Sequence, residues 1–490
     1  MIIRMDSTAY GAWPDQTGAS TALVVNPLSN WWSYGLTLEL ASRLKKDGHR
    51  VHYLDLGPIV PNSLQVNSED VTSTWRFKKP DTRINEFLAK QGIEPVQSFR
   101  SDTSINPLPN FETLSQLRSW AFEGKAFGAI ISAAMSGTLK QRDFDVRTHA
   151  ALIQEHVLAS IQISNVIRWS VSELSPNLVG TTNDRLVGAG ISLLESRVAN
   201  IETLIAYWGS DEGRLVTYAN SLYSPEEWRA FIAKKWESVP PTHNQLTNLD
   251  SEIELAGQVG FTSSQNFKPS SVSELNGTPK SRPKSLAFFA TTPWEYSGLT
   301  QYPEGYFVDQ IAAVRSILEI LDPEVWTVFV RHHPPRRGEK PKAEVDSWES
   351  LRSFPNLVEI APDSQVDSYK LMDESDINAV WVSTLGAESI ARGKRTLVLG
   401  RPYWLDPSWS CATPTPDALG RFLEDMSRTI DPSLLRPYLH YVASNGTLFQ
   451  FMSGVGPERL RVGGIRLYPR KFFGMIVSLG IRGKRFWQVV

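Results

Sequence analysis

Two hydroxyl side chains that follow a buried run are the residues best placed to do chemistry in this sequence. The apolar run 379–382 stops at Ser383 and Thr384, and residues 385–392 then have helical composition before a second apolar run at 396–399. Hydroxyls and free backbone N–H groups at the start of a helix favour an anion such as a nucleotide phosphate. This stretch therefore predicts a phosphate-binding turn.

A histidine follows another buried run about 50 residues upstream. Residues 325–330 read as a strand, and His333-Pro334 comes shortly after it. An imidazole can donate to a phosphate oxygen, and proline fixes the turn that aims it. Arg331 beside it raises the local affinity for anions, although a solvated surface turn is the alternative. Two strands of one sheet would deliver the histidine and the hydroxyls to the same edge.

Gly386 and Glu388 lie just beyond the hydroxyl pair. A capping box needs an acid three residues after the cap, whereas Glu388 stands four residues after Thr384 and five after Ser383. Gly386 in a first helical turn is costly unless a backbone or a ligand approaches closely. We therefore expect Glu388 to accept hydrogen bonds from a ribose, with an ordinary helix cap as the competing interpretation.

Other carboxylates could serve as catalytic groups. Glu295 follows the first strand of the second half, where it could contact the nucleotide or the acceptor, or cap the next helix. Asp184, next to Asn183, is a candidate catalytic base in the first half, as is the pair Asp211-Glu212. A simple turn is the alternative for both pairs, because Asn and Asp favour turns.

Composition and motifs exclude several classes of function. The net charge of −2 argues against nucleic-acid binding, and the single Cys411 excludes an intrachain disulfide framework and suits a reducing compartment. No His and carboxylate cluster has metal-ligand spacing, and no P-loop or Gly-x-Ser-x-Gly elbow occurs. We expect neither a metal nor a cofactor.

The first half has the pattern of a parallel α/β sheet. Strand 21–26, helix 36–46 and strand 50–55 form a βαβ unit, with residues 27–35 as a loop. The remaining elements expected in this half are strands 128–133, 204–208 and 214–218, a long helix 150–167, and a helix capped by Ser224. We place an N-terminal Rossmann-like acceptor domain at residues 1–261.

The second half repeats this type of pattern after a linker. Residues 262–284 are rich in Ser, Asn, Pro, Lys and Gly, which is typical of a linker or an exposed loop. The expected elements that follow are strands 285–290, 325–330, 357–360, 378–382 and 396–399 and helices 306–321, 366–373 and 385–392. They predict a C-terminal nucleotide-binding domain at residues 285–452, with its ligand at the carboxyl ends of the strands.

The segments 325–334, 382–389, 393–395 and 399–404 together resemble the capsule polysaccharide biosynthesis family, which includes Kdo transferases. In that family a His-Pro motif and a Ser-x-x-Gly-x-Glu motif flank the nucleotide-sugar pocket, and a Gly-Arg-Pro-Tyr/Phe segment follows the next strand. The resemblance covers roughly residues 285–452. It implies an α/β fold with two Rossmann-like domains in the GT-B arrangement, His333, Ser383 and Thr384 on the donor phosphate, and Glu388 on the ribose or base.

One departure from the family leaves the sugar open. The small, Gly-rich continuation of the family is replaced here by Trp404-Leu-Asp-Pro-Ser-Trp. The resemblance implies a metal-independent glycosyltransferase that moves a sugar from a CMP- or UDP-linked donor to a surface or capsular glycan or glycolipid. A CDP-alditol phosphotransferase of the teichoic-acid type and a catalytically silent GT-B glycan-binding module are the alternatives.

The last segment, residues 453–490, combines basic and aromatic side chains. Arg470, Lys471, Lys484 and Arg485 stand among large apolar residues such as Trp487. This pattern fits either a terminal helix docked on the core or contact with an anionic membrane surface. The start lacks a secretory signal, and no run is long enough to span a bilayer. We expect a cytoplasmic protein, with peripheral contact at the inner face of the plasma membrane as an open alternative.

Overall fold

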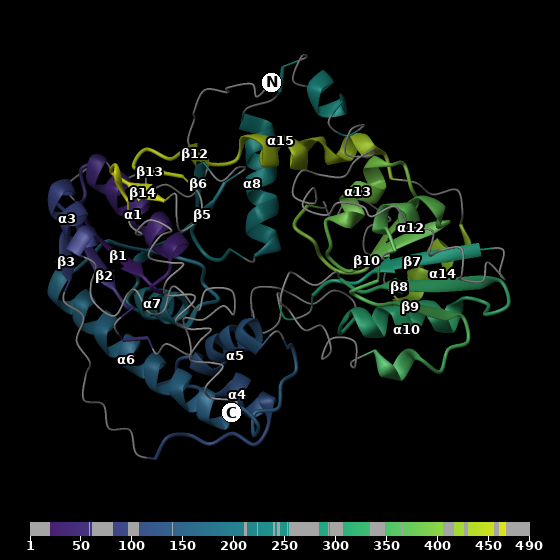
Figure 1. The fold of residues 1–490 in the computed structure, drawn as a ribbon, viewed down its shortest axis with the longest axis horizontal. Coiled ribbons are helices and arrows are strands. Elements are labelled where there is room, and N and C mark those ends of the chain that lie inside the picture. The colour runs from purple at the N-terminus through teal and green to yellow at the C-terminus, as the bar shows by residue number, and fades with distance from the viewer. Residues whose placement is uncertain are drawn as a thin grey trace, which may run out of the picture. The chain divides into compact units, whose positions relative to one another are not determined.

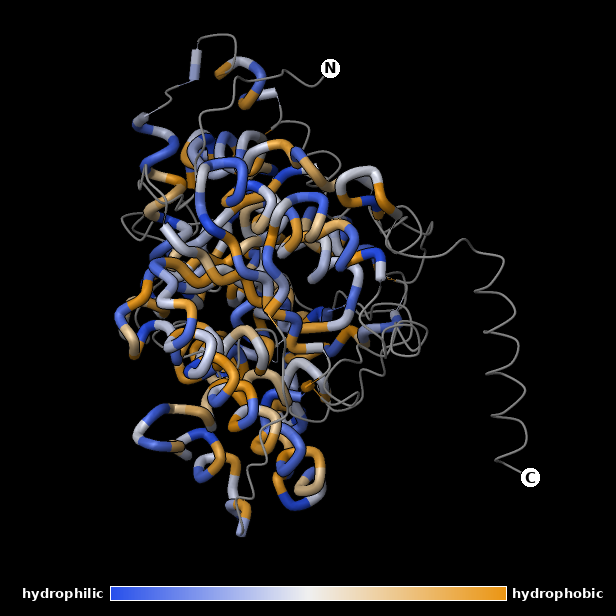
Figure 2. Tube along the Cα trace, turned by 90° about the vertical axis from the view of Figure 1, so that its left-hand side faces the viewer, coloured by the Kyte–Doolittle hydropathy of each residue, from blue (hydrophilic) through white to orange (hydrophobic). Residues whose placement is uncertain are grey.

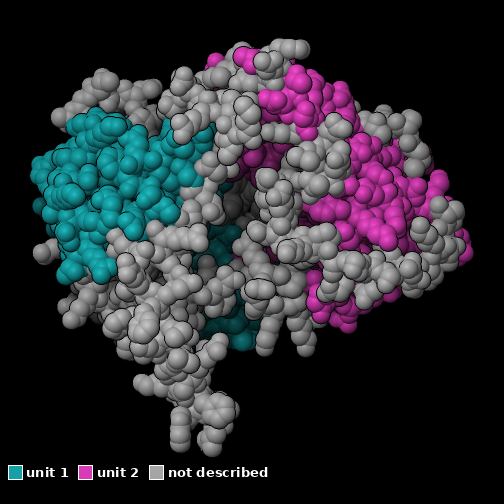
Figure 3. All heavy atoms as spheres, turned by 45° about the horizontal axis from the view of Figure 1, so that its top comes forward, with its two compact units in different colours: residues 1–223, 297–300, 444–490 teal, residues 224–296, 301–443 magenta. Residues whose placement is uncertain are grey.

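The computed structural model separates into two compact units, shown in different colours in Figure 3. Unit 1 contains residues 1–223, 297–300 and 444–490, and unit 2 contains residues 224–296 and 301–443. The described residues run from 20 to 466, with gaps at 58, 61–81, 97–106, 140, 210–212, 223, 239–240, 243–245, 252, 254–283, 293, 295–306, 334–347, 365, 405–415, 426–429 and 455–459.

Unit 1 is built on a sheet with a parallel centre. Its strand order is β12-β6-β5-β4-β1-β2-β3. The strands are β1 (Thr21–Asn26), β2 (Arg50–Asp55), β3 (Glu94–Val96), β4 (Leu178–Thr182), β5 (Glu202–Trp208), β6 (Arg214–Tyr218) and β12 (Thr447–Leu448). β1 to β5 pair in parallel, whereas β6 and β12 extend the edge in antiparallel fashion. The central strands are buried on both faces, as a parallel sheet covered by helices requires.

Helices cover both faces of this sheet (Figure 1). α1 (Trp31–Lys46) and α3 (Thr82–Gln91) contribute to one hydrophobic core, and α5 (Phe127–Leu139), α6 (Ala150–Leu174) and α7 (Val187–Val198) to the other. Short α4 (Leu114–Ser119) packs on α5. Figure 2 shows hydrophobic and hydrophilic stretches interleaved along the tube, as expected for helices that bury one face against a sheet. Unit 1 is thus a doubly wound, Rossmann-like sheet, as the sequence predicts.

Two expectations for unit 1 are wrong in detail. Residues 128–133 belong to helix α5 and not to a strand, because the apolar run continues to Leu139 and short apolar runs do not distinguish a buried helix from a strand. The strand paired with β1 on that side is β4, which the sequence reading missed. Helix α1 begins at Trp31 and not at residue 36, since the Asn30 side chain caps it by accepting from the Ser33 N–H at 2.9 Å.

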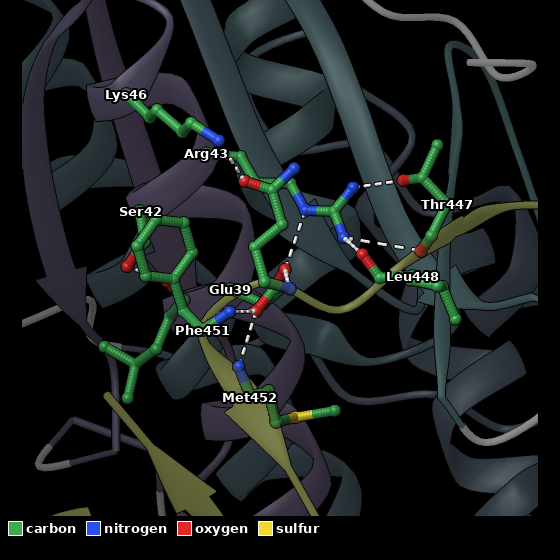
Figure 4. A network of polar contacts seen from close by, with 10 residues as sticks. Glu39, Ser42, Arg43, Lys46, Thr447, Leu448, Phe451 and Met452 are labelled. Atoms are coloured by element: carbon green, nitrogen blue, oxygen red, sulfur yellow. Dashed lines mark hydrogen bonds and ion pairs between the residues drawn. The ribbon is translucent and has the colours of Figure 1, made fainter. Parts of the chain in front are cut away.

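The segment after residue 444 returns to unit 1 and is fastened to α1 by a buried acid. The Glu39 carboxylate accepts from the backbone N–H groups of residues 450, 451 and 452 at 2.8, 2.8 and 2.7 Å (Figure 4). Arg43 donates to Glu39 at 2.7 Å and reaches the side chain of Thr447 and the carbonyl of Leu448. A small antiparallel sheet of β13 (Met452–Ser453), β14 (Arg461–Val462) and β15 (Ile465–Arg466) follows.

Unit 2 contains a fully parallel sheet with the strand order β11-β10-β7-β8-β9. Its strands are β7 (Lys284–Phe289), β8 (Trp326–Arg331), β9 (Leu357–Ile360), β10 (Ile377–Val380) and β11 (Thr396–Val398). Each coincides with a predicted strand to within two residues at either end. The sheet is again buried on both faces, which explains why its strands read as continuous apolar runs.

The helices of unit 2 also lie on both faces of its sheet. α10 (Gln310–Ile320) and α14 (Pro416–Glu424) share one hydrophobic core with the strands. α12 (Ser368–Glu374) and α13 (Leu385–Ala391) share the other, together with residues of α8 (Pro225–Ser238) and α15 (Arg436–Ser444). The α/β fold class with two Rossmann-like units is therefore confirmed.

The division into units does not follow the expected domain boundaries. The first unit ends at residue 223 and not at 261, because α8 packs in unit 2, where the ring centroid of Trp228 lies 4.4 Å from that of Tyr403 and 6.0 Å from that of Tyr441. The second ends at residue 443 and not at 452, because residues 447–448 pair with β6 and residues 450–452 donate to Glu39, both in unit 1. The predicted linker 262–284 lies outside the described residues except for Lys284.

The basic aromatic segment is described only to Arg466, so the expectation of membrane contact rests on residues outside the described part. Among the helices that the structure describes, none combines the length and the apolar character needed to cross a bilayer.

Candidate functional site

The topology of unit 2 marks the edge where a ligand is expected. From β7 the chain moves to β8 and β9 on one side, and then returns to β10 and β11 on the other side. The switch point therefore lies between β7 and β10. Open α/β sheets bind ligands outside the carboxyl ends of the strands at such a point.

The register of the strands places three polar segments at this edge. Phe289 pairs with Val380 on one side and with Arg331 on the other. Two positions further on in the three segments stand Thr291, Val382 and His333, and Thr292 and Ser383 come next after the first two of these. Neighbouring strands are about 4.8 Å apart, so the three segments span roughly 10 Å. A phosphate group bound at this edge could therefore contact side chains from adjacent segments.

Ser383 and Thr384 occupy the turn between β10 and α13, as predicted. Both are half-buried. Ser383 Oγ accepts from the Leu385 N–H at 3.3 Å, which is a local turn contact. Thr384 stands at the N-cap but its side chain makes no capping hydrogen bond. Its hydroxyl is therefore not committed to the end of the helix.

Gly386 has a close neighbour, as expected, but that neighbour is the protein's own side chains. A Cβ at this position would lie 2.6 Å from Val380 Cγ2 and 2.8 Å from the indole of Trp404. Trp404 is itself buried, and its Nε1 donates to the Val382 carbonyl at 3.3 Å. Packing against Trp404 thus accounts for the glycine, and a ligand contact at Gly386 stays a prediction.

Glu388 is buried, with 1% of its surface exposed. Its Oε2 accepts from the Tyr369 hydroxyl at 2.6 Å, the short distance typical of a hydrogen bond to a carboxylate. The guanidinium of Arg392 lies over the Tyr369 ring, 4.9 Å from its centroid. One carboxylate oxygen is thus engaged inside unit 2, and the predicted ribose contact remains a prediction.

The end of β8 carries two histidines with opposite environments. His333 is exposed at the carboxyl edge, where the sequence predicts it. His332 is buried, packs edge-on against Trp348 and lies 3.1 Å from Glu359 through Nε2. Burial lowers the pKa of His332 although Glu359 acts to raise it. Of these two histidines, His333 is the one exposed to solvent, and its predicted contact with a donor phosphate stays a prediction.

Arg331 is 2% exposed and donates to the carbonyls of Ala361 and Ser364. Burial lowers its pKa, while Asp363 and Asp367 nearby act in the opposite direction. Its guanidinium supports the loop after β9, so the anion contact predicted for it remains a prediction.

Thr291 and Thr292 are edge residues that the sequence reading missed as a site. Both are buried just after β7, and within the described part of the chain neither hydroxyl has a hydrogen-bond partner. The signal was visible, because a hydroxyl pair follows a buried run here as it does at Ser383-Thr384. Glu295, the residue predicted at this edge, lies outside the described residues.

Asp184 occupies the corresponding edge of unit 1, in the turn after β4. β1 is followed by β2 and β3 on one side and by β4 and β5 on the other, so this turn lies at the switch point of that sheet. Burial raises the pKa of Asp184, and a hydrogen bond from the Ser221 hydroxyl counteracts it. The turn character is also present, since Asn183 has a φ of 48°. Asp211 and Glu212 lie outside the described residues.

Within the described part of the chain, no three His, Cys, Asp or Glu side chains are grouped so that they could hold a metal ion.

Comparisons with known proteins give a distant likeness only. No protein-family model and no curated protein matches the chain. Among solved structures it is similar to the KpsC β-Kdo 2,7 transferase of Thermosulfurimonas dismutans, with 16% identity and a TM-score of 0.33 over 56% of this chain and 80% of that one. The β-Kdo 2,4 transferase from the same organism shows 13% identity and a TM-score of 0.33 over 53% and 78%. A UDP-GlcNAc 2-epimerase of Methanocaldococcus jannaschii shows 9% identity and a TM-score of 0.29 over 86% and 98%. These values assign neither a family nor an activity, which must be inferred from the chain's own residues.

Proposed function

We propose that the protein is a glycosyltransferase that moves a sugar from a CMP- or UDP-linked donor to a surface or capsular glycan acceptor. The observation that carries the proposal is the alignment of His333 with two hydroxyl pairs at the carboxyl edge of β8, β7 and β10, around the switch point of unit 2. The His-Pro and Ser-x-x-Gly-x-Glu motifs in this order support a nucleotide-sugar donor at that edge.

The chemistry of sugar transfer suits such an edge. When the glycosidic bond to the donor breaks, negative charge develops on the leaving phosphate. Hydroxyl and imidazole donors that are already in place stabilise this charge without reorganising. In the proposal, His333, Ser383 and Thr384 supply these donors.

For a transfer that inverts the configuration of the sugar, Asp184 of unit 1 is the proposed base that takes the proton of the acceptor hydroxyl. A general base works best when its pKa is not far below the working pH. Burial raises the pKa of Asp184, and its turn follows β4 at the switch point of the unit 1 sheet. Both properties favour this role over a purely structural turn.

A donor panel tests the proposal. The intact protein is incubated with CMP-, UDP- and GDP-linked sugars and with CDP-glycerol and CDP-ribitol, with and without glycan acceptors, and release of nucleotide is followed. Cleavage of a nucleotide sugar that depends on His333 supports the proposal. Exclusive use of a CDP-alditol indicates the phosphotransferase, and binding of glycan with no donor cleaved indicates a silent module.

A further inference from the structure

We propose that the hydroxyls of Thr291 and Thr292 form a phosphate subsite that holds the leaving phosphate of the donor. The inference rests on the proposed function and adds to it two residues that no motif assigns. It places the phosphate at the switch point itself, with these hydroxyls on the β7 side and Ser383 and Thr384 on the β10 side.

The two hydroxyls are buried in unit 2. Thr291 is 5% exposed and Thr292 is 7% exposed, and neither Oγ1 has a hydrogen-bond partner among the residues that the structure describes. Burying a hydroxyl without a partner costs free energy. Thr396, on the same sheet, shows the usual solution, since its Oγ1 bonds to Ser389 Oγ at 2.7 Å. Two adjacent unsatisfied hydroxyls at a ligand-binding edge therefore point to a partner supplied by a ligand.

The backbone that carries these hydroxyls is fixed by hydrogen bonds to Gln310. The Thr291 N–H donates to Gln310 Oε1 at 3.0 Å, and Gln310 Nε2 donates to the Thr291 carbonyl at 2.8 Å. Gln310 is buried at the start of α10, which Asp309 caps by accepting from the Ala312 N–H at 2.8 Å. These two hydrogen bonds between the Gln310 side chain and the Thr291 backbone hold the hydroxyls in place before any ligand arrives.

The hydroxyl groups determine which class of ligand could bind here. Gln310 engages both backbone polar groups of Thr291, so the hydroxyl is the polar group of Thr291 that remains for a ligand. A phosphate oxygen only accepts, so a rotating hydroxyl satisfies it in one orientation. Neutral donors also suit a leaving phosphate, since they stabilise charge as it develops and leave the product free to depart.

Valine substitution tests the proposal, because valine keeps the β-branched shape and removes the hydroxyl. Binding of UDP, CMP and inorganic pyrophosphate to Thr291→Val, Thr292→Val and the double variant is measured by calorimetry, and unfolding by urea in parallel. We expect the affinity for the nucleotides to fall at least about tenfold per hydroxyl. Competition by pyrophosphate should weaken to the same extent, and the urea midpoint should not fall, since each substitution removes an unsatisfied buried group.

Matched variants separate the subsite from a role in packing. Thr396→Val removes a buried hydroxyl that does have partners, so it should lower the urea midpoint and leave nucleotide affinity unchanged. Thr291→Ser and Thr292→Ser keep the hydroxyl and should keep the affinity. Equal losses in the serine and valine variants would make packing the cause and overturn the subsite.

The outcomes also distinguish this inference from the proposed function. If the intact protein binds UDP or CMP and the valine variants bind them equally well, the subsite is refuted while the proposed function stands. If the intact protein binds none of the nucleotides and no pyrophosphate, both are refuted.

Discussion

His332 and His333 show how far two adjacent residues of one type can differ. His332 is packed between Trp348 and Glu359, whereas His333 is exposed at the edge that the proposed donor would occupy. We expect His333→Ala to leave the free energy of unfolding nearly unchanged and to lower turnover about 10²-fold, the scale for losing one preorganised donor to developing charge. Steady-state kinetics on the donor identified by the panel measure this effect.

The neighbouring histidine provides the control. His332→Ala removes a buried ring and leaves Glu359 without that partner, so it should cost about 2–4 kcal/mol of unfolding free energy. A folded His333→Ala protein with normal turnover would reduce His333 to a surface turn residue.

Glu388 is the residue for which position and environment suggest different roles. Because its carboxylate is buried and accepts from Tyr369, Glu388→Gln replaces a charge-assisted hydrogen bond by a neutral one. We expect a loss of about 1–2 kcal/mol in unfolding free energy, measured by urea denaturation. Tyr369→Phe should cost a similar amount. Weaker nucleotide binding at unchanged stability would instead place Glu388 on the ribose, as the sequence predicts.

At the scale of elements, the approach of Trp404 to α13 fixes the residue at 386. Gly386→Ala would insert a methyl group into a space that Trp404 and Val380 already fill, and overpacking of this kind costs about 1–3 kcal/mol. Gly420→Ala in α14 is the matched control, since nothing lies within 4 Å of the added Cβ. It should stabilise the protein by about 0.5–1 kcal/mol through helix propensity alone. Equal effects at the two glycines would rule out the packing explanation.

Helix α6 carries a buried histidine that should make stability depend on pH. Burial lowers the pKa of His156 to about 4, and its Nδ1 lies 2.8 Å from the Leu152 carbonyl. Between pH 6.5 and 4 the unfolded chain binds a proton that the folded chain does not, so stability falls as the pH falls. The expected contribution is about 3 kcal/mol across this window.

The same measurement on a variant isolates this effect from the carboxylates. His156→Gln cannot take up the proton, so its unfolding free energy should decline less steeply than that of the natural protein between pH 6.5 and 4. Parallel curves for the two proteins would show that His156 is not the source.

At the scale of the whole molecule, the contacts of Glu39 join segments more than 400 positions apart in the chain. Glu39→Gln weakens the bonds to three backbone N–H groups and leaves Arg43 buried without its ion pair. We expect a loss of about 3–5 kcal/mol, seen as a lower urea midpoint and as faster hydrogen exchange of the amides of residues 450–452.

An exposed acid is the control for this prediction. Glu94 pairs with Arg50 at 2.9 Å on the surface, so Glu94→Gln should cost less than about 1 kcal/mol. Retained protection of amides 450–452 in the Glu39 variant would mean that backbone pairing alone holds the segment.

The spacing of apolar residues and turn residues along the sequence predicted most of the strands correctly. The βαβ unit at residues 21–55 and all five strands of unit 2 follow from apolar runs bounded by turns. The helix at 127–139 was not predictable in this way, because a short apolar run fits a buried helix and a strand equally well.

The unit boundaries and the side-chain states at the site were not predictable either. Residues 447–452 return to unit 1 through pairing with β6 and through hydrogen bonds to Glu39, and no local pattern reveals these distant partners. The sequence identified the carboxyl edge of β8 and β10. It could not tell that Arg331 and His332 are buried while His333 is exposed, since that depends on Trp348 and on the loop after β9.

The discontinuity of unit 1 has a consequence for synthesis on the ribosome. β6 receives its edge partner β12 only when residues 447–448 have emerged, about 230 residues after β6 itself. At translation rates of about 5–20 residues per second, that delay is roughly 10–45 s. During this time unit 2 can complete its own sheet, whereas the nascent unit 1 presents an unpaired strand edge and the uncovered face of α1. Translation speed and chaperone supply would therefore affect the yield of this protein through unit 1, even though its first strand is made at the outset.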